Sequence, residues 1–290
     1  MIDLHTHSAA SDGSLSPAEL IRTAAGKGLR AVALTDHDTI EGLEEAEGAA
    51  ARAGIRLIPG VEVAIRWSDA SGTGPPGEFH LLGLGLKTPS PAFLEALAGL
   101  SRLREARNRE ILDRINKTGI DAEYDELRSL SGGGSLGRPH FAALLVKRGL
   151  VKNPAQAFDR YLGKGKPFYV PKDGLDFTEA LGLIRESGGI SVLAHPMSLY
   201  IAWGSLPAFV QELARRGLDG IEAWHPTAGV RSCKRLEELG RSLGLAVTAG
   251  SDFHGEHRPD RKLGFTAGGR RIEDAVLEAI PALGDYHHSA

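Results

Sequence analysis

The sequence is poor in cysteine, with Cys233 as the single one among 290 residues. An internal disulfide is therefore impossible, and a zinc site built from several thiolates cannot form within the chain. One cysteine also fits a reducing compartment, so we expect the protein to be cytoplasmic. We interpret Cys233 itself as a helix residue without a functional role.

Long apolar runs and an excess of positive charge are also missing. Runs such as "AVAL" and "LLGLGL" are far too short to cross a bilayer, and no basic start followed by an apolar stretch opens the chain. We therefore expect neither a membrane span nor a signal peptide. The net charge of -3 argues against binding to duplex DNA, which needs a basic face. A small anionic substrate, held by metal ions or a few local cations, is compatible with this charge.

Short apolar segments alternate with helical patterns in both halves of the chain. This alternation predicts an α/β fold with a mostly parallel sheet or barrel. Ser16, Pro17 and Glu19 form a helix-start signal with a capping box. Strands are predicted at residues 1–4, 30–35, 55–65, 79–86, 190–195, 220–225 and 245–250. Helices are predicted at residues 16–28, 39–53, 178–187, 207–216 and 231–243.

The strand pattern lapses between about residues 89 and 167, where three helical patterns follow one another at 91–119, 137–150 and 153–163. We interpret this stretch as a helical insertion into the α/β domain. The predicted organisation is a first barrel part at 1–88, a helical insertion at 89–168 and a second barrel part at 169–290. "SGGGS" (131–135) is predicted to be a loop in the insertion, and 68–78 a turn-rich hairpin or loop.

Polar side chains that bind metals gather at the ends of the predicted strands. The carboxyl ends of parallel strands point to one face, and that face carries the chemistry of such folds. His80 departs from this pattern because it opens its strand. It reaches the same face only if that strand runs opposite to the others or if the preceding loop folds in. The candidate ligands are His5, His7, Asp12, His37, Glu62, His80, His195, Asp252 and His254.

Each motif alone has a simpler interpretation. A His-x-His pair such as His5 and His7 points to one face of a strand but is more often a surface pair, and "TDHDT" alone is typical of a helix N-cap. Together the motifs are hard to explain as caps, because gathering so many polar groups without a cation costs several kcal/mol. Imidazole and carboxylate without thiolate suit Mn, Fe or Zn. Nine ligands are too many for one ion and predict two or three divalent metal ions.

The motifs together resemble the PHP (polymerase and histidinol phosphatase) family. They are "DLHTHSAASDG", "LTDHDT", "GVE", "FHLLG", "LAHP" and "GSDFHG", and they extend over essentially the whole chain. The resemblance implies a distorted (β/α)7 TIM-like barrel, a trinuclear metal site and phosphoester hydrolysis by a metal-activated hydroxide. The family is expected to use water rather than a side chain as nucleophile, so side chains mainly position and stabilise.

The resemblance also implies a ligand set for each ion. His5, His7, Glu62 and Asp252 would hold the first ion. Glu62, His80 and His195 would hold the second, and Asp12, His37 and His254 the third. We assign His195, His254 and Asp252 to catalysis, with either histidine or a water on a metal ion as the proton source for the leaving group.

The helical insertion indicates which members of the family this sequence resembles most. "LGRPHFAALLVKRGLV", "AFDRYLGKGKPFYVPK" and "GIEAWHP" are similar to nucleoside 3',5'-bisphosphate phosphatases and to 5'-to-3' exoribonucleases acting on short RNA. The resemblance implies a small phosphorylated nucleotide or short RNA as substrate, with the insertion as a substrate cap. Arg138 can bind a phosphate with its planar fork, whereas Lys164 is also typical of a plain surface lysine. The substrate-binding candidates are Arg138, His140, Lys164 and His225.

Three alternatives remain open at this point. A histidinol-phosphate phosphatase shares the barrel but is not associated with this insertion. A non-catalytic metal-binding module would be expected to lose ligands, whereas all nine positions are filled here. An amidohydrolase on a similar barrel typically carries a carboxylated lysine, and no strand of this sequence ends in such a lysine. His257, His287 and His288 lie in polar surroundings and are expected at the surface.

Overall fold

The computed structural model describes residues 1–67, 74–130 and 136–284. The predicted loop at 131–135, the first part of the turn-rich segment at 68–78, and His287 and His288 lie outside these residues. The chain forms two compact units. The barrel unit comprises Met1–Leu97 and Gly174–Ala290, and the helical unit comprises Ala98–Asp173. Each unit has a hydrophobic core of its own.

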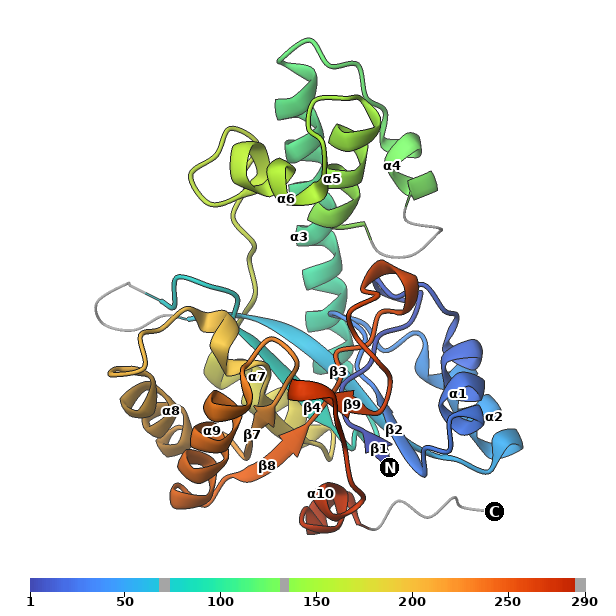
Figure 1. Ribbon diagram of the computed structural model, residues 1–290, viewed down its shortest axis with the longest axis vertical. Helices are drawn as coiled ribbons and strands as arrows, with labels where there is room; N and C mark the ends of the chain where they lie inside the picture. Colours follow the sequence, from blue (N-terminus) through green and yellow to red (C-terminus); the bar gives the residue numbers. More distant parts are fainter. Residues whose placement is uncertain (68–73, 131–135, 285–290) are drawn as a thin grey trace. The chain divides into compact units, whose positions relative to one another are not determined.

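The barrel unit is built on one curved sheet with helices around it (Figure 1). Its strands are short, apolar and almost wholly buried, as expected for a sheet covered on both faces. The sheet order is β1 (Ile2–Asp3), β2 (Ala31–Leu34), β3 (Arg56–Arg66), β4 (His80–Leu84), β6 (Ile190–Leu193), β7 (Gly220–Trp224) and β8 (Ala246–Ala249). Strand β5 (Leu175–Asp176) pairs with the far end of β3.

Backbone hydrogen bonds join the first and last strands of this order. The Leu4 amide donates to the Ala249 carbonyl at 3.4 Å, and the Asp252 amide donates to the His5 carbonyl at 2.9 Å. A further bond, 2.9 Å long, runs from the His7 amide to the Phe253 carbonyl. The sheet therefore closes into the distorted barrel that the resemblance implies.

Strand β4 is the exception to the parallel arrangement. It pairs antiparallel with β3 on one side and with β6 on the other. The amino end of β4, where His80 lies, therefore meets the carboxyl ends of its neighbours. This is the first of the two arrangements that bring His80 to the chemical face.

Helices surround the barrel, and their starts are set by local signals. In α1 the Ser16 hydroxyl accepts from the Glu19 amide at 3.3 Å while the Glu19 carboxylate accepts from the Ser16 amide at 2.9 Å, so the predicted capping box is present. The helices are α1 (Pro17–Gly26), α2 (Leu43–Ala53), α7 (Phe177–Glu186), α8 (Leu206–Arg215), α9 (Val230–Ser242) and α10 (Ala275–Glu278). Shorter elements are η2 (Pro196–Leu199), η3 (Gly255–His257), η4 (Ala267–Gly269), η5 (Pro281–Leu283), β9 (Phe265–Thr266) and β10 (Arg270–Arg271).

The predicted start of α2 at residue 39 is wrong. Asp38 has a φ of 54°, outside the helical region, and its carboxylate accepts from the Ala64 amide at 2.8 Å. This bond ties the segment after β2 to β3, so the helix begins only at Leu43. The end is as predicted, with Gly54 in the left-handed conformation that glycine favours.

The helical unit packs its apolar side chains into a separate core that includes Phe141, Leu144 and Ile115. One helix predicted at 153–163 is instead α6 followed by a π-helical turn, η1, and α4 was not predicted. The elements are α3 (Pro91–Asn116, whose first residues belong to the barrel unit), α4 (Tyr124–Leu130), α5 (Arg138–Lys147), α6 (Pro154–Ala157) and η1 (Phe158–Leu162).

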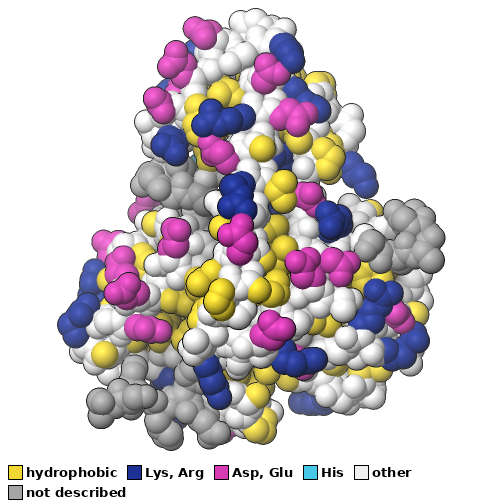
Figure 2. Space-filling view, turned by 180° about the vertical axis from the view of Figure 1, so that it is seen from behind, with side chains coloured by type: hydrophobic (Ala, Val, Ile, Leu, Met, Phe, Trp, Pro, Cys, Tyr) yellow, Lys and Arg dark blue, Asp and Glu magenta, His cyan; other side chains and the backbone are white. Residues whose placement is uncertain are grey.

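The surface carries charges of both signs. On the face in Figure 2, Lys and Arg side chains alternate with Asp and Glu side chains instead of gathering into a patch of one sign. Among the described residues, none of the helices combines the length and the apolar composition needed to cross a membrane.

Candidate metal centre

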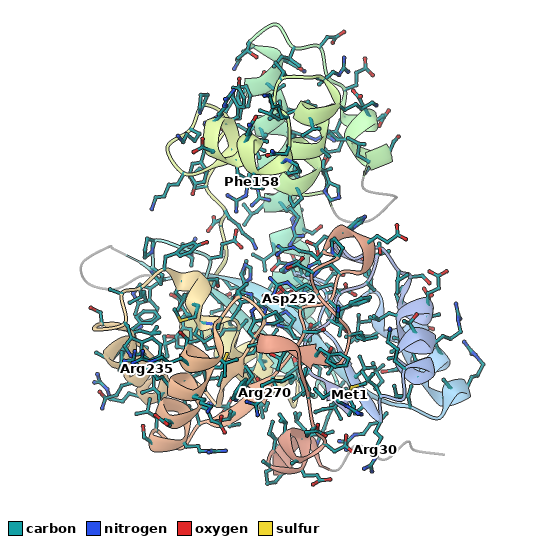
Figure 3. All side chains as sticks on the ribbon, in the orientation of Figure 1. Met1, Arg30, Phe158, Arg235, Asp252 and Arg270 are labelled. Carbon is teal, nitrogen blue, oxygen red and sulfur yellow. The ribbon has the colours of Figure 1, made fainter. Side chains whose placement is uncertain are left out.

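The nine residues predicted as metal ligands come together at one end of the barrel. In Figure 3, Asp252 lies at this end of the barrel unit, and Met1 and Arg30 lie at the other. Loops after β1, β2, β6 and β8 supply seven of the nine residues, while β3 and the start of β4 supply Glu62 and His80. Atoms within 4.8 Å of one another define four groups among the nine, His7/Asp12/His37/His254, His5/His7/Asp252, His5/Glu62/His195 and His37/Glu62/His80, and a fifth group, His5/Glu222/His225, that adds two other residues.

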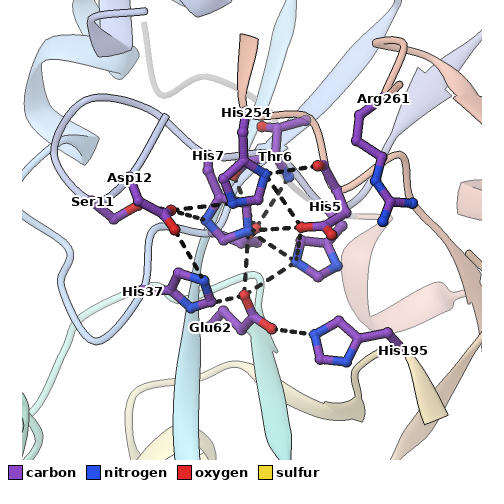
Figure 4. A network of polar contacts seen from close by, with 12 residues as sticks. His5, Thr6, His7, Ser11, Asp12, His37, Glu62, His195, His254 and Arg261 are labelled. Carbon is purple, nitrogen blue, oxygen red and sulfur yellow. Dashed lines mark hydrogen bonds and ion pairs between the residues drawn. The ribbon is translucent and has the colours of Figure 1, made fainter. Parts of the chain in front are cut away.

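Glu62 lies at the centre of these groups and is fully buried (Figure 4). Its two oxygens face different histidines, as expected of a carboxylate shared by two ions. Oε2 lies 3.0–3.3 Å from nitrogens of His37, His5 and His7. Oε1 lies 2.7 Å from nitrogens of His80 and His195. Burial acts to raise the pKa of Glu62, but the charges on His37 and His80 outweigh it and hold this pKa well below its usual range.

Asp252 faces the same two nitrogens of His5 and His7 that Glu62 faces. Its Oδ1 lies 3.6 Å from His5 Nε2 and 3.4 Å from His7 Nε2. Its backbone has a φ of 54°, an uncommon conformation for a residue other than glycine. Such conformations cost about 1–3 kcal/mol and persist where the surrounding structure fixes them, often at functional sites.

Asp12 enters the centre from a loop that a second carboxylate anchors. Asp36 Oδ1 accepts from the Ser8 amide at 2.8 Å and from the Ser11 hydroxyl at 2.6 Å, and its Oδ2 accepts from the Ser8 hydroxyl at 2.6 Å. These bonds hold the loop in place, and Asp12 Oδ1 lies 3.2 Å from His254 Nε2. The loop requires Gly13, since a Cβ there would lie 2.3 Å from the His7 carbonyl oxygen.

The arrangement fits metal ions and is difficult to stabilise without them. His5 Nε2 and His7 Nε2 face each other at 3.1 Å, and the buried His7 Nδ1 has no hydrogen-bond partner among the described residues. Burial acts to lower the pKa of His7, but Asp252 and Glu62 outweigh it and raise this pKa to about 10. A donor set of imidazole and carboxylate matches Mn, Fe or Zn.

His195 and His254 use both ring nitrogens within the centre. His195 Nδ1 lies 2.5 Å from Ser198 Oγ, and its Nε2 faces Glu62. His254 Nδ1 donates to the Asp252 carbonyl at 2.8 Å, and its Nε2 faces Asp12. These contacts favour a ligand role over a proton-transfer role for both rings.

The four substrate-binding candidates lie in different parts of the molecule. His225 follows β7 and is buried in the centre, with Nε2 3.3 Å from Asp252 Oδ2. Arg138 is the first residue of α5, and His140 Nδ1 accepts from the Gly137 amide at 3.0 Å. Lys164 is exposed in the turn after η1. The last three therefore belong to the helical unit and only His225 to the barrel unit.

Two acidic residues of the centre were not predicted as site residues. Glu222 is fully buried and contacts His5, and Asp36 anchors the Asp12 loop. Both follow the strand-end pattern that identified the nine ligands, so this pattern was a usable signal. Asp36 lies within "LTDHDT" and Glu222 within "GIEAWHP", but the resemblance assigns a ligand role to neither, which explains why they were not predicted.

Comparisons with known proteins agree with this geometry. Residues 3–166 match the PHP domain family. A 5'-3' exoribonuclease of Haemophilus influenzae is 38% identical over 252 residues, which cover 87% of this chain and 89% of that protein. A 3',5'-nucleoside bisphosphate phosphatase of Chromobacterium violaceum is 34% identical over 91% of each chain.

A solved structure is similar over almost its full length. It is described as an amidohydrolase from Chromobacterium violaceum with bound sulfate and no metal, and it has a TM-score of 0.82, 32% identity and 96% coverage of both chains. The family match exceeds half of the chain, and the relatives cover most of it at more than 30% identity. The chain therefore belongs to the PHP domain family and is a metal-dependent phosphoesterase, a hydrolase.

Proposed function

We propose that this phosphoesterase hydrolyses phosphate monoesters of nucleotides. The substrates would be nucleoside 3',5'-bisphosphates and related mononucleotides, together with short 5'-phosphorylated RNA degraded in the 5'-to-3' direction. The observation that carries the proposal is the gathering of the nine candidate ligands at one end of the barrel, seven of them buried, with Glu62 at the centre. The nucleotide class is supported by the relatives, which are named for an RNA substrate and a nucleoside bisphosphate.

The proposed centre holds two or three divalent ions, Mn, Fe or Zn, in the three ligand sets that the resemblance implies. When bound, such ions neutralise phosphoryl oxygens and activate water for in-line attack. Glu62 is placed to belong to two sets because its two oxygens face different histidines. Asp36 contributes by fixing the loop that presents Asp12.

The substrate is proposed to be held partly by the helical insertion. Arg138 would bind the phosphate that is not cleaved, since its planar guanidinium matches two phosphate oxygens. Its position at the start of α5 adds the positive end of a helix dipole. His140, Lys164 and His225 are proposed as further substrate contacts.

A substrate panel tests the proposal. The purified protein, loaded with Mn²⁺, is assayed with adenosine 3',5'-bisphosphate, a 5'-phosphorylated RNA dinucleotide, AMP and histidinol phosphate. The expected result is a kcat/KM for the bisphosphate at least about tenfold above that for histidinol phosphate, a difference of about 1.4 kcal/mol in transition-state binding. A preference for histidinol phosphate would favour the alternative function. No hydrolysis of any of the four with Mn²⁺, Fe²⁺ or Zn²⁺ would contradict the proposed substrate class.

A further inference from the structure

We propose that Glu222 is a positioning residue of the metal centre. Its carboxylate holds two candidate ligands, His5 through the imidazole ring and His195 through the backbone amide, in the orientation that metal binding requires. This inference rests on the proposed metal centre, and it extends that centre to a residue outside the nine ligands.

The two oxygens of Glu222 have different partners. Oε1 lies 3.0 Å from His5 Nδ1, and Oε2 accepts from the His195 amide at 2.8 Å. Glu222 lies on β7 and is fully buried, so no water competes for either contact from solvent. One side chain thus connects the ends of three strands, β1, β6 and β7.

The contact with His5 selects one form of the imidazole. A neutral imidazole carries one N–H and one lone pair, and a carboxylate can only accept. Nδ1 of His5 must therefore carry the hydrogen, which leaves the lone pair on Nε2. Nε2 is the nitrogen that faces the centre, 3.3 Å from Glu62 Oε2. A carboxylate behind a ligand histidine typically fixes its orientation and strengthens the ligand.

The contact with His195 stabilises an unusual backbone. His195 has φ 26° and ψ 66°, a left-handed conformation that is unfavourable for a residue with a side chain. The amide of His195 donates to the side chain of Glu222. Because the backbone is held this way, His195 Nε2 lies 2.7 Å from Glu62 Oε1.

The contact between Glu222 and His5 requires a glycine at position 250. A Cβ on Gly250 would lie 2.3 Å from the His5 Cβ and 2.6 Å from Glu222 Oε1. Only glycine at this position allows His5 and Glu222 to meet. The neighbouring ligand His7 lacks such support, because its Nδ1 has no hydrogen-bond partner among the described side chains and backbone.

A carboxylate at the opposite end of the same strands provides a matched control. Asp219 directly precedes β7, and its Oδ2 accepts from the Ser191 amide at 2.9 Å and from the Ser191 hydroxyl at 2.7 Å. It connects β6 to β7 as Glu222 does, but it contacts none of the nine ligands. The side chain of Asp219 is 36% exposed, so D219N tests whether losing a carboxylate between these strands affects metal binding when no ligand is contacted.

The test compares Mn²⁺ affinity in the full-length wild type, E222Q, E222A and D219N, measured by equilibrium dialysis against a chelator. We expect E222A to bind Mn²⁺ about 10–100-fold more weakly, the range typical of outer partners of ligand histidines. E222Q should lose less, because its amide oxygen can still accept from one of the two donors. D219N should bind within about twofold of wild type, which is below the lower end of that range. Melting temperatures of the metal-free proteins show whether each variant is folded.

Each outcome decides a different point. If the wild type binds no Mn²⁺, Fe²⁺ or Zn²⁺, the proposed metal centre fails. If the wild type binds and both Glu222 variants bind equally tightly, the centre stands and the positioning role is wrong. If neither variant folds, ¹⁵N-histidine NMR of the Zn²⁺-loaded wild type shows which ring nitrogen of His5 carries the proton. The His5 signals are assigned as those missing from the spectrum of H5N. The inference requires a proton on His5 Nδ1, and a proton on Nε2 instead would overturn it.

Discussion

The two units of the molecule treat their charged side chains in opposite ways. The barrel unit buries acids and histidines together, and Glu62, His5 and His7 are inaccessible to solvent. The helical unit keeps charged side chains at the surface, several of them in pairs one helical turn apart. In one such pair, Lys117 Nζ lies 2.6 Å from Asp113 Oδ2. The buried side chains of the helical unit are almost all apolar.

The difference shows that the barrel unit, and not the helical unit, carries the energetic cost of a buried polar site. Burying carboxylates and imidazoles without a counter-ion is costly, so the barrel unit is complete only with a cation. The helical unit buries few polar side chains, Asn108 and His140 among them, and is stabilised by apolar burial. All groups of potential metal ligands found among the described residues lie in the barrel unit.

The largest expected effect is the loss of hydrolysis when a buried ligand is removed. We expect His7→Ala and Asp252→Ala each to lower kcat/KM for adenosine 3',5'-bisphosphate by more than about 100-fold, beyond the range for residues that only support ligands. Both residues face His5 Nε2, so each substitution removes a ligand from the centre of the cluster. Steady-state kinetics at trace metal, with circular dichroism to verify folding, measures the effect.

The control for this prediction comes from the helical unit. Glu110→Ala removes an exposed carboxylate whose partner is Arg114, and it should leave kcat/KM unchanged. Full activity in His7→Ala or Asp252→Ala at trace metal would contradict the metal centre and would remove the basis of the comparison between the units.

The strand-end pattern predicted which residues gather at one end of the barrel because it depends only on chain order. Parallel strands place their carboxyl ends together, so His5, His195 and Asp252 could be grouped without coordinates. His80 could not be placed, since its position depends on the direction of β4, which the pairing of β3 with β4 sets. Sequence patterns report which residues are apolar, and they do not report strand direction.

Side-chain orientation was the second quantity beyond the sequence. Glu222 lies within the strand predicted at 220–225, but its role depends on which nitrogen of His5 it meets. The late start of α2 has a similar cause, because Asp38 bonds across to β3 through a left-handed backbone. Both features arise from contacts between segments far apart in the chain, where local propensity gives no signal.

A smaller effect on activity is expected for Arg138, a residue of the helical unit that we propose binds substrate. We expect Arg138→Ala to raise KM for adenosine 3',5'-bisphosphate about tenfold, or about 1.4 kcal/mol, with a much smaller rise for a simple phosphomonoester. The reason is that the guanidinium is proposed to bind the phosphate that is not cleaved. Arg138→Lys should recover only part of the affinity, because an ammonium lacks the planar fork. Equal rises in KM for both substrates would contradict the proposed contact between Arg138 and the second phosphate.

The smallest expected effect concerns the surface pairs of the helical unit. Lys117 Nζ lies 2.6 Å from Asp113 Oδ2, and their side chains are 73% and 58% exposed. Exposed pairs at this spacing contribute about 0.3–0.5 kcal/mol, because water screens the charges and two long side chains lose freedom. Lys117→Ala should therefore lower the free energy of unfolding in urea by no more than about 0.5 kcal/mol. The coupling with Asp113→Ala in a double-mutant cycle should vanish in about 1 M salt, where the Debye length is about 3 Å. A coupling above about 1 kcal/mol that persists in salt would mean that the helical unit also relies on strong ion pairs, and the contrast with the barrel unit would then be one of degree.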